Sequence, residues 1–238
     1  MDAVYLVGPA STDELRYSLR SLALLGCVDR LVVVGHRPVW CRPDLHIPVQ
    51  PPRPGKHFST WANLRTAAHH PEVSPQFVLM NDDFFVLHRM DRPPVWHRGP
   101  IAGQVANHRR TGNRRMLNRR LGVDELLDAI GVPGRLDYEL HVPLLVDRAA
   151  MRDVIALAEQ VRTVRMEPVG KRTLYGNYAR IGGTQVEDVK IRDFRAIPSA
   201  ELPFVSTSDY SFRQGTVGRW IRKRFPVPSR YEEGGRRG

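Results

Sequence analysis

With 238 residues and 42% hydrophobic content, the chain has the composition of a globular protein of one large or two small domains, and no apolar run reaches the roughly 18 residues of a membrane span. Its two cysteines exclude a cysteine-rich metal site and suit a reducing compartment. The formal net charge of +11 indicates a polyanionic partner such as nucleic acid, an anionic polymer or a phosphorylated substrate.

The first 35 residues predict a strand, a helix and a second strand. The N-terminus lacks the basic start and long apolar core of a secretory signal, so a cytoplasmic location is expected. Residues 4–8 form an apolar strand-like run, leucines recur at helical spacing over 13–26, and residues 31–35 form a β-branched run. A βαβ unit of this kind pairs its strands in parallel through a right-handed crossover.

Further elements follow at intervals along the chain. Proline crowds residues 37–56, which predicts an irregular connection, and a helix is expected over about 59–70. The apolar run 77–80 predicts a third strand, buried on both faces. Two later helices are predicted over 123–130 and 147–161. The sequence contains no internal repeat and no evident linker, so a single domain is the simplest account.

Two adjacent carboxylates, Asp82 and Asp83, interrupt the most hydrophobic run of the chain, FVLMNDDFFVL over 77–87. One interpretation is a turn between strands, because Asn-Asp-Asp is ordinary turn chemistry. The other is a ligand site, since unpaired carboxylates are costly in an apolar setting and ligands of open α/β sheets bind at the carboxyl ends of strands. Magnesium or manganese held there would neutralise the diphosphate of a nucleotide-sugar donor.

Six short segments form an ordered set along the chain: ELRYSLRSL, DRLVVVGHRPVW, FSTWANLR, FVLMNDDFFVL, ELHVPLL and STSDYSF. The first four, in this order, resemble the second conserved region of the Stealth family, whose members are sugar-phosphate transferases acting on capsular polysaccharides or lysosomal-enzyme glycans. ELHVPLL and STSDYSF are similar to the family's third and fourth regions. In its compact size the chain also resembles glycosyltransferase-like proteins encoded by actinobacterial phages.

The resemblance implies an α/β fold: a single Rossmann-like domain of glycosyltransferase A type over 1–230, with a central, mostly parallel sheet and helices on both faces. Residues 1–100 would bind the nucleotide sugar, with a UDP-sugar as the favoured donor, and residues 101–230 would bind the acceptor. Residues 231–238 are expected to form a disordered basic tail. The transferred group is either a sugar or a sugar phosphate, and a phage-encoded enzyme would act in the host cytoplasm.

Five residues are candidates for catalysis and metal binding. Asp82 and Asp83 would hold the metal, and Asp209 would complete its shell or orient the acceptor, unless it caps a turn. His141 is the best candidate general base, since an imidazole can take a proton from a hydroxyl at neutral pH, although a structural histidine is the alternative. Glu139 would share the role of base if His141 binds phosphate instead.

Donor contacts are expected from Asp82 and from five further positions. Arg16 and Arg20 share a helical face, so they would either clamp donor phosphates or form surface salt bridges with neighbouring acidic residues. Lys56 precedes the FSTWANLR segment, where a point charge would meet a phosphate. Ser59 and Asn63, within that segment, are candidate donor contacts through the same resemblance.

Two basic clusters favour DNA as the acceptor. The modified group would be a hydroxymethylated base, which would have to flip out of the duplex to reach the site. A solvated helix or a mobile loop is the alternative for the first of them. A polysaccharide or protein glycan remains an alternative acceptor, and a non-catalytic nucleic-acid-binding module an alternative function. Aromatic residues among the cations of the second cluster suit base stacking. The candidate nucleic-acid contacts are Arg109, Arg110, Arg114, Arg115, Arg119 and Arg120, then Arg219, Trp220, Arg222, Lys223 and Arg224.

Overall fold

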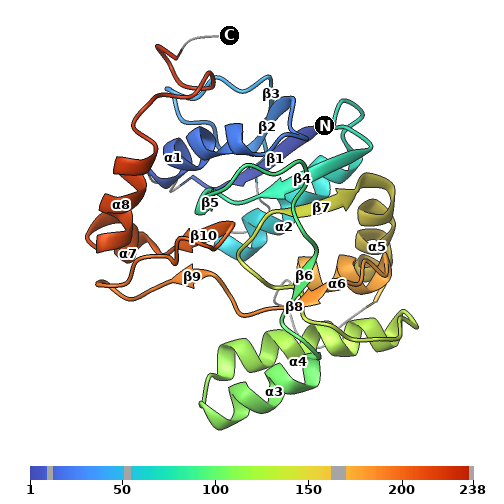
Figure 1. Ribbon diagram of the computed structural model, residues 1–238. Helices are drawn as coiled ribbons and strands as arrows, with labels where there is room; N and C mark the ends of the chain where they lie inside the picture. Colours follow the sequence, from blue (N-terminus) through green and yellow to red (C-terminus); the bar gives the residue numbers. More distant parts are fainter. Residues whose placement is uncertain (10–12, 51–54, 162–169, 236–238) are drawn as a thin grey trace.

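A five-stranded sheet forms the centre of the protein (Figure 1). The computed structural model describes residues 1–9, 13–50, 55–161 and 170–235, apart from the side chains of Lys56 and His57. The strand order is β3-β2-β1-β4-β7, and β7 alone runs antiparallel to its neighbour. The strands are β1 (Asp2–Val7), β2 (Arg30–Gly35), β3 (Leu45–Ile47), β4 (Gln76–Met80) and β7 (Leu144–Asp147).

Helices cover both faces of this sheet because its strands are apolar on both sides. In β1, Tyr5 packs in one core layer with α1 (Glu14–Ser21), whereas Leu6 packs in a second layer with α2 (Lys56–His69) and α5 (Arg148–Gln160). Side chains alternate between the faces of a strand, so a continuous apolar run serves two layers. The predicted α/β fold with a mostly parallel sheet and helices on both faces is confirmed.

Two smaller sheets attach the second half of the chain to the first. β10 pairs antiparallel with β5 and parallel with β9, and β6 pairs with β8. Because β5 begins directly after the turn that ends β4, this pairing brings residues 190 and 206 to the acidic turn. The strands are β5 (Phe84–Val86), β6 (Trp96–His97), β8 (Thr184–Gln185), β9 (Lys190–Ile191) and β10 (Phe204–Thr207).

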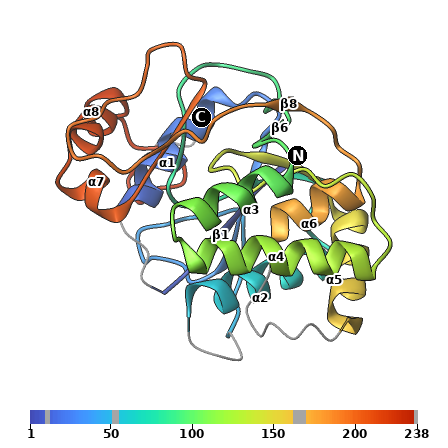
Figure 2. The same cartoon turned by 90° about the horizontal axis from the view of Figure 1, so that it is seen from below.

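An antiparallel pair of helices, the α3–α4 hairpin, projects below the sheet (Figures 1 and 2). Gly112, with a φ of +67°, makes the turn, and Asn113 caps α4 by accepting the backbone N–H of Met116 at 3.2 Å. Among the described helices, none combines the length and apolar character needed to cross a bilayer. The remaining helices are α3 (Ile101–Arg110), α4 (Arg114–Ala129), α6 (Lys171–Tyr178), α7 (Asp209–Arg213), α8 (Thr216–Arg224) and the short 3₁₀ helix Leu22–Leu24.

The structure differs from the predicted elements in three places. The irregular connection 37–56 contains β3, whose three residues are too short to give a periodic signal. The helix predicted over 123–130 is the second half of α4, since its first half is rich in arginine and poor in apolar residues. In the predicted disordered tail, Tyr231 and Glu232 are buried, and residues 236–238 lie outside the described part.

Candidate functional site

The acidic turn after β4 is a partly buried polar site. Asp83 is only 7% exposed, and its Oδ2 accepts hydrogen bonds from Lys190 Nζ at 2.6 Å and Ser206 Oγ at 3.2 Å. Its other oxygen, Oδ1, and Oδ1 of Asn81 are buried and have no hydrogen-bond partner among the described residues. Buried acceptors are almost always paired, so these two oxygens mark a place where a ligand would be stabilised.

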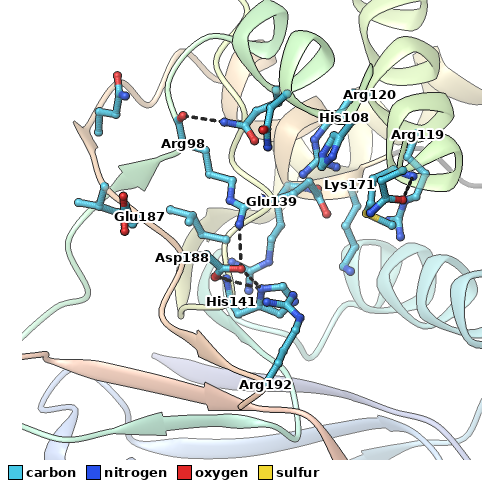
Figure 3. Close-up of a pocket in the computed structure, with 18 of the residues that line it drawn as sticks. Arg98, His108, Arg119, Arg120, Glu139, His141, Lys171, Glu187, Asp188 and Arg192 are labelled. Atoms are coloured by element: carbon cyan, nitrogen blue, oxygen red, sulfur yellow. Dashed lines mark hydrogen bonds and ion pairs between the residues drawn. The ribbon is translucent and has the colours of Figure 1, made fainter. Parts of the chain in front are cut away.

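A cavity of about 920 Å³ opens beside this turn. Asn81 is one of its lining residues. The other walls come from the α3–α4 hairpin, residues 139–141, the start of α6 and residues 185–192 (Figure 3). These segments are far apart in sequence and meet because β9 joins the sheet of β5, next to the carboxyl end of β4. The cavity therefore lies where ligands of open α/β sheets bind.

His141 and Asp188 form an oriented pair in this cavity. His141 Nδ1 lies 2.8 Å from Asp188 Oδ2, and the backbone N–H of His141 donates to the same carboxylate at 3.1 Å. Although burial alone raises the pKa of Asp188, the hydrogen bond from His141 and the charges of His141 and Arg98 lower it to about 2. An ionised Asp188 holds the proton on Nδ1, so Nε2, which has no partner among the described residues, carries the lone pair of a base.

Arg172 links this pair to the acidic turn. It is buried, donates to the carbonyl oxygen of Val142 at 2.6 Å and lies over the ring of Phe84, 5.1 Å from its centroid. The same Phe84 ring packs edge-on against His141 at 6.3 Å. Burial lowers the pKa of Arg172 to about 10, while the charges of Glu139, Asp83 and Asp188 oppose this effect. The guanidinium thus neutralises carboxylates on both sides of the site.

Glu139 has a structural part in this arrangement. Its Oε1 accepts the backbone N–H groups of Arg172 at 2.9 Å and Thr173 at 3.3 Å, so it caps the start of α6. Burial alone raises its pKa, but the charges of Lys171, Arg120, Arg119 and Arg172 lower it to about 2. A carboxylate this acidic is a poor base at neutral pH, so the geometry does not support the predicted sharing of this role with His141.

A second cavity, of about 490 Å³, lies at the carboxyl ends of β1 and β2. The predicted donor residues Ser59 and Asn63 line it, but Asn63 Nδ2 donates to Val7 O at 3.2 Å and Val34 O at 2.9 Å. Gly35 has a φ of +101°, and a side chain there would collide with Asn63. Asn63 therefore ties the two strand ends together, and the side chain of Lys56 lies outside the described atoms.

The predicted donor arginines of α1 serve another purpose. Arg20 donates to both oxygens of buried Glu232, at 2.8 and 2.9 Å, and Arg16 adds a bond at 3.0 Å. The ring of Trp40 covers Arg16, at 4.3 Å. Both guanidinium groups are thus paired within the protein, which favours the salt-bridge alternative over a clamp for donor phosphates. Their bonds to Glu232 tie residues 231–235 to α1.

Asp209 does not join the acidic pair. It is the exposed first residue of α7, which is capped instead by Ser208, whose Oγ accepts the backbone N–H of Ser211 at 3.2 Å. Asp82 is half-buried. Within the described part of the chain, no three His, Cys, Asp or Glu side chains are grouped to hold a metal. The predicted set of Asp82, Asp83 and Asp209 is therefore not assembled here.

The two predicted nucleic-acid clusters differ in exposure. In the α3–α4 hairpin, Arg120 is buried in an ion pair with Asp137, so it cannot be a surface contact, and Arg119 lines the cavity. The four remaining residues of this cluster are exposed on the hairpin: Arg109, Arg110, Arg114 and Arg115.

The cluster on α8 packs against its own aromatic residues. Arg222 lies over Phe212 at 4.3 Å, and Arg224 lies over Trp220 at 5.4 Å. Trp220 itself is half-buried against an apolar core cluster. Arg219, Lys223 and Arg224 are exposed, whereas Tyr231, one of the aromatic residues expected to stack on bases, is buried. Stacking on the half-buried Trp220 stays a prediction.

Several residues of the site were not predicted from the sequence. They are Arg98, Lys171, Arg172, Asp188, Lys190 and Arg192. Asp188 lies 47 residues from His141, and no spacing rule connects them. The only local signal is the acidic pair 187–188 just before the short strand β9, which is weak because acidic pairs are common.

Comparison of the sequence with known protein families finds none that matches, and comparison with curated proteins finds no similar sequence.

Proposed function

We propose that the protein is a glycosyltransferase that uses a nucleotide-sugar donor and activates its acceptor hydroxyl with His141. The observation that carries this proposal is the His141–Asp188 pair, at 2.8 Å, in the same cavity as Asn81 of the acidic turn. Transfer from a diphosphate donor to a hydroxyl requires a base that takes the hydroxyl proton and a group that neutralises the diphosphate. A base oriented by a carboxylate would be the first, and a cation held by the carboxylates at the end of a parallel strand would be the second.

The donor would lie across the carboxyl ends of β1, β2 and β4. The smaller cavity, beside Val7, Gly35 and Ser59, would take the nucleoside of a UDP-sugar, and the acidic turn would take the diphosphate. The parallel order β3-β2-β1-β4, with the acidic turn directly after β4, supports a fold of glycosyltransferase A type, as does the resemblance of the sequence motifs to the Stealth family.

Magnesium or manganese is the proposed cofactor, and the turn has suitable oxygen atoms. The unpartnered Oδ1 atoms of Asn81 and Asp83 flank Asp82 in the sequence. Magnesium is often held by one or two carboxylates, with substrate phosphates and water completing its shell. When bound, the cation would neutralise the charge of the departing diphosphate. Lys190, 2.6 Å from Asp83, supplies a fixed positive charge at the same turn.

In the proposed step, the acceptor oxygen bonds to the anomeric carbon of the donor sugar, and the bond from that carbon to the diphosphate oxygen breaks. The hydroxyl proton moves to Nε2 of His141, and the bonding electron pair leaves with the nucleoside diphosphate. Asp188 stabilises the imidazolium that forms, since its low pKa keeps it ionised.

A hydroxymethylated base in DNA is the proposed acceptor. The exposed residues Arg109, Arg110 and Arg114 lie on the hairpin whose inner side lines the cavity, so they would hold backbone phosphates near its opening. A base flipped from the duplex would bring its hydroxymethyl group toward His141.

Transfer of a sugar phosphate or sugar to a polysaccharide or protein glycan is the second candidate. It is favoured by the cations that line the cavity beside His141, namely Arg98, Arg172 and Arg192. Such cations would stabilise a phosphoryl group while an acceptor oxygen attacks it.

The test uses purified protein with manganese or magnesium, a panel of nucleotide sugars, and DNA containing 5-hydroxymethylcytosine. Mass spectrometry of digested nucleosides should show a hexose or pentose increment that is lost in His141→Gln and Asp83→Asn and kept in Arg89→Gln, a change at an exposed loop arginine. Donor turnover without nucleoside modification would move the acceptor to glycans. Unaltered DNA binding without any donor turnover would support the non-catalytic module instead.

A further inference from the structure

We infer that Phe194 and Tyr210 form a platform, here called the aromatic platform, on which a base of single-stranded nucleic acid stacks beside the large cavity. Phe194 is 39% exposed and Tyr210 56% exposed, and their ring centroids lie 5.9 Å apart. Phe194 lies between β9 and β10, and Tyr210 lies in the first turn of α7. The identification of the bound strand as the acceptor rests on the proposed function, whereas the stacking itself does not.

The two rings of the aromatic platform differ in exposure from every other aromatic ring of the described chain. All other phenylalanine, tyrosine and tryptophan side chains of the described residues are buried or half-buried. The two exceptions come from separate segments of the chain and are in contact with each other. Single exposed apolar side chains are ordinary, whereas clustered ones indicate a surface that contacts a ligand or partner.

Hydrogen bonds hold both halves of the aromatic platform in place. The carbonyl oxygen of Phe194 accepts the backbone N–H of Thr216, the first residue of α8, at 2.8 Å. Ser211, which follows Tyr210, donates from Oγ to the carbonyl oxygen of Ile191 at 2.8 Å and so ties α7 to the end of β9. Rings held on a fixed backbone lose little conformational freedom when a ligand binds.

Three arginines accompany the aromatic platform. Arg192 and Arg195 lie on either side of Phe194 in the sequence, and Arg213 lies three positions after Tyr210, on the same face of α7. All three side chains are exposed, and none makes an ion pair within the described ranges of the chain. Each guanidinium can therefore donate to a phosphate of a bound strand.

Two carboxylates lie in the same segments. Asp193 Oδ1 accepts the backbone N–H of Arg195 at 2.7 Å, so this carboxylate is bonded to its own loop. Asp209 is the exposed first residue of α7. Because three guanidinium groups accompany these two carboxylates, the surface around the rings attracts a polyanion.

This combination of rings and cations favours nucleic acid over a neutral glycan. Stacking of a base on an aromatic side chain contributes about 1–3 kcal/mol, and arginines beside the ring hold the backbone phosphates. A neutral sugar would also stack on a ring, but the three guanidinium groups would have no charge to neutralise. The bases of a duplex are already stacked on one another, so the ligand is a single strand or an unpaired nucleotide.

The aromatic platform adjoins the cavity that contains His141. Arg192 lines this cavity, and Figure 3 shows it close to His141. Phe194 follows Arg192 by two residues, which span at most about 7 Å of chain. A base stacked on the platform would therefore belong to a nucleotide close to the one whose hydroxyl enters the cavity.

The first experiment measures binding of a labelled oligothymidylate of about twelve nucleotides by fluorescence anisotropy, without donor or metal. Tyr210→Ala and Phe194→Ala should each weaken binding about tenfold, since a stacked base loses its ring, and Tyr210→Phe should restore it. Val39→Ser, a change at an exposed apolar side chain elsewhere, should leave the affinity unchanged. Affinities of both alanine variants equal to that of the wild type would overturn the platform.

An abasic oligonucleotide of the same length separates stacking from attraction to phosphates. The wild type should bind it about tenfold more weakly than the oligothymidylate, and Tyr210→Ala should weaken this binding no further. Equal losses for both oligonucleotides in Tyr210→Ala would refute stacking. If the alanine changes instead weakened binding of neutral maltohexaose and left the oligothymidylate unaffected, the platform would be a sugar site and the assignment to nucleic acid would be wrong.

The inference and the proposed function can fail separately. Asp83→Asn should keep the affinity for the oligothymidylate while losing transfer. Binding that depends on Tyr210, without transfer by the wild type to any acceptor, would retain the platform and contradict the proposed function. Transfer to DNA by a protein whose binding is indifferent to Tyr210 and Phe194 would contradict the platform alone.

Discussion

The contact between α1 and Glu232 and the wall of the large cavity both gather arginines, but they compensate this charge differently. Arg16 and Arg20 share a buried carboxylate through direct bonds of 2.8 to 3.0 Å, and each also lies over an aromatic ring. In the cavity, the buried guanidinium of Arg172 donates to a backbone carbonyl oxygen, and the charges of three separate carboxylates, Glu139, Asp83 and Asp188, act on it.

This difference teaches that a net charge of +11 does not by itself locate a partner. Ion pairs closed within the protein leave nothing for a ligand, whereas a cation that lines a cavity can also act on a ligand bound there. Replacements in the two regions should therefore separate stability from function.

The largest effect is expected from the oriented base in the cavity. In Asp188→Asn, His141 loses the carboxylate that fixes its tautomer, so we expect transfer to fall about a thousandfold. Release of nucleoside diphosphate measures this rate. Glu187→Gln, a change at the exposed neighbouring carboxylate, should keep nearly full turnover, and a similar loss in both variants would contradict the role of the pair.

The next largest effect, on stability, is expected from the ion pairs between α1 and Glu232. Glu232→Gln leaves two guanidinium groups without their buried counter-ion, so the free energy of unfolding should fall by about 3 kcal/mol. Urea unfolding followed by circular dichroism measures it. Glu233→Gln, which breaks an exposed pair with Arg42, should cost about 0.5 kcal/mol or less. If the two variants lost equal free energy of unfolding, the burial of Glu232 would not add to its contribution to stability.

Glu139 should make a smaller contribution to stability, and this contribution should depend on pH. Its folded pKa of about 2 is below its unfolded value, so its contribution is present above about pH 5 and is lost as the pH falls toward 2. Because the side chain keeps some exposure, we expect Glu139→Gln to cost about 2 kcal/mol at pH 7. Chemical unfolding between pH 7 and pH 2 should show the two proteins converging, and a constant difference would contradict the assigned charge.

The smallest effect is expected in DNA binding. Arg114→Gln, on the exposed side of the hairpin, should reduce the slope of log affinity against log salt by about 1, the value for one lost phosphate contact. Arg222→Gln should leave the slope unchanged, because that guanidinium lies over Phe212 and donates to its carbonyl oxygen at 3.1 Å. The opposite ranking would place the DNA surface on α8.

The central part of the fold could be predicted from the sequence because each signal is local. The predicted runs 4–8 and 31–35 are continuous and apolar, and residues 4–7 and 31–35 lie in parallel strands. The short strands β5, β9 and β10 could not be found in this way, since they have two to four residues and depend on distant partners.

The site was predictable only in part, for a related reason. Asp82 and Asp83 stand out because an acidic pair in an apolar run is visible in the chain itself, and His141 was singled out through the resemblance of ELHVPLL to a family motif. The positions of Asp188 and Lys190 depend on the pairing of β9 with β10 and of β10 with β5. These strands are far apart in sequence, so no local pattern predicts their pairing. The partner of the α1 arginines could not be predicted, because Glu232 lies 212 residues away from Arg20.

That long separation has a consequence for how the protein is made. While the ribosome is still synthesising the middle of the chain, α1 can pack on the emerging sheet and Arg16 can pair with Asp13, but the carboxylate that Arg16 and Arg20 share is absent until residue 232 is made. Contacts so distant in sequence close last and slow folding. The nascent chain should therefore hold an incompletely neutralised helix for most of its synthesis, and it should stay open to chaperones or polyanions until the final contact forms.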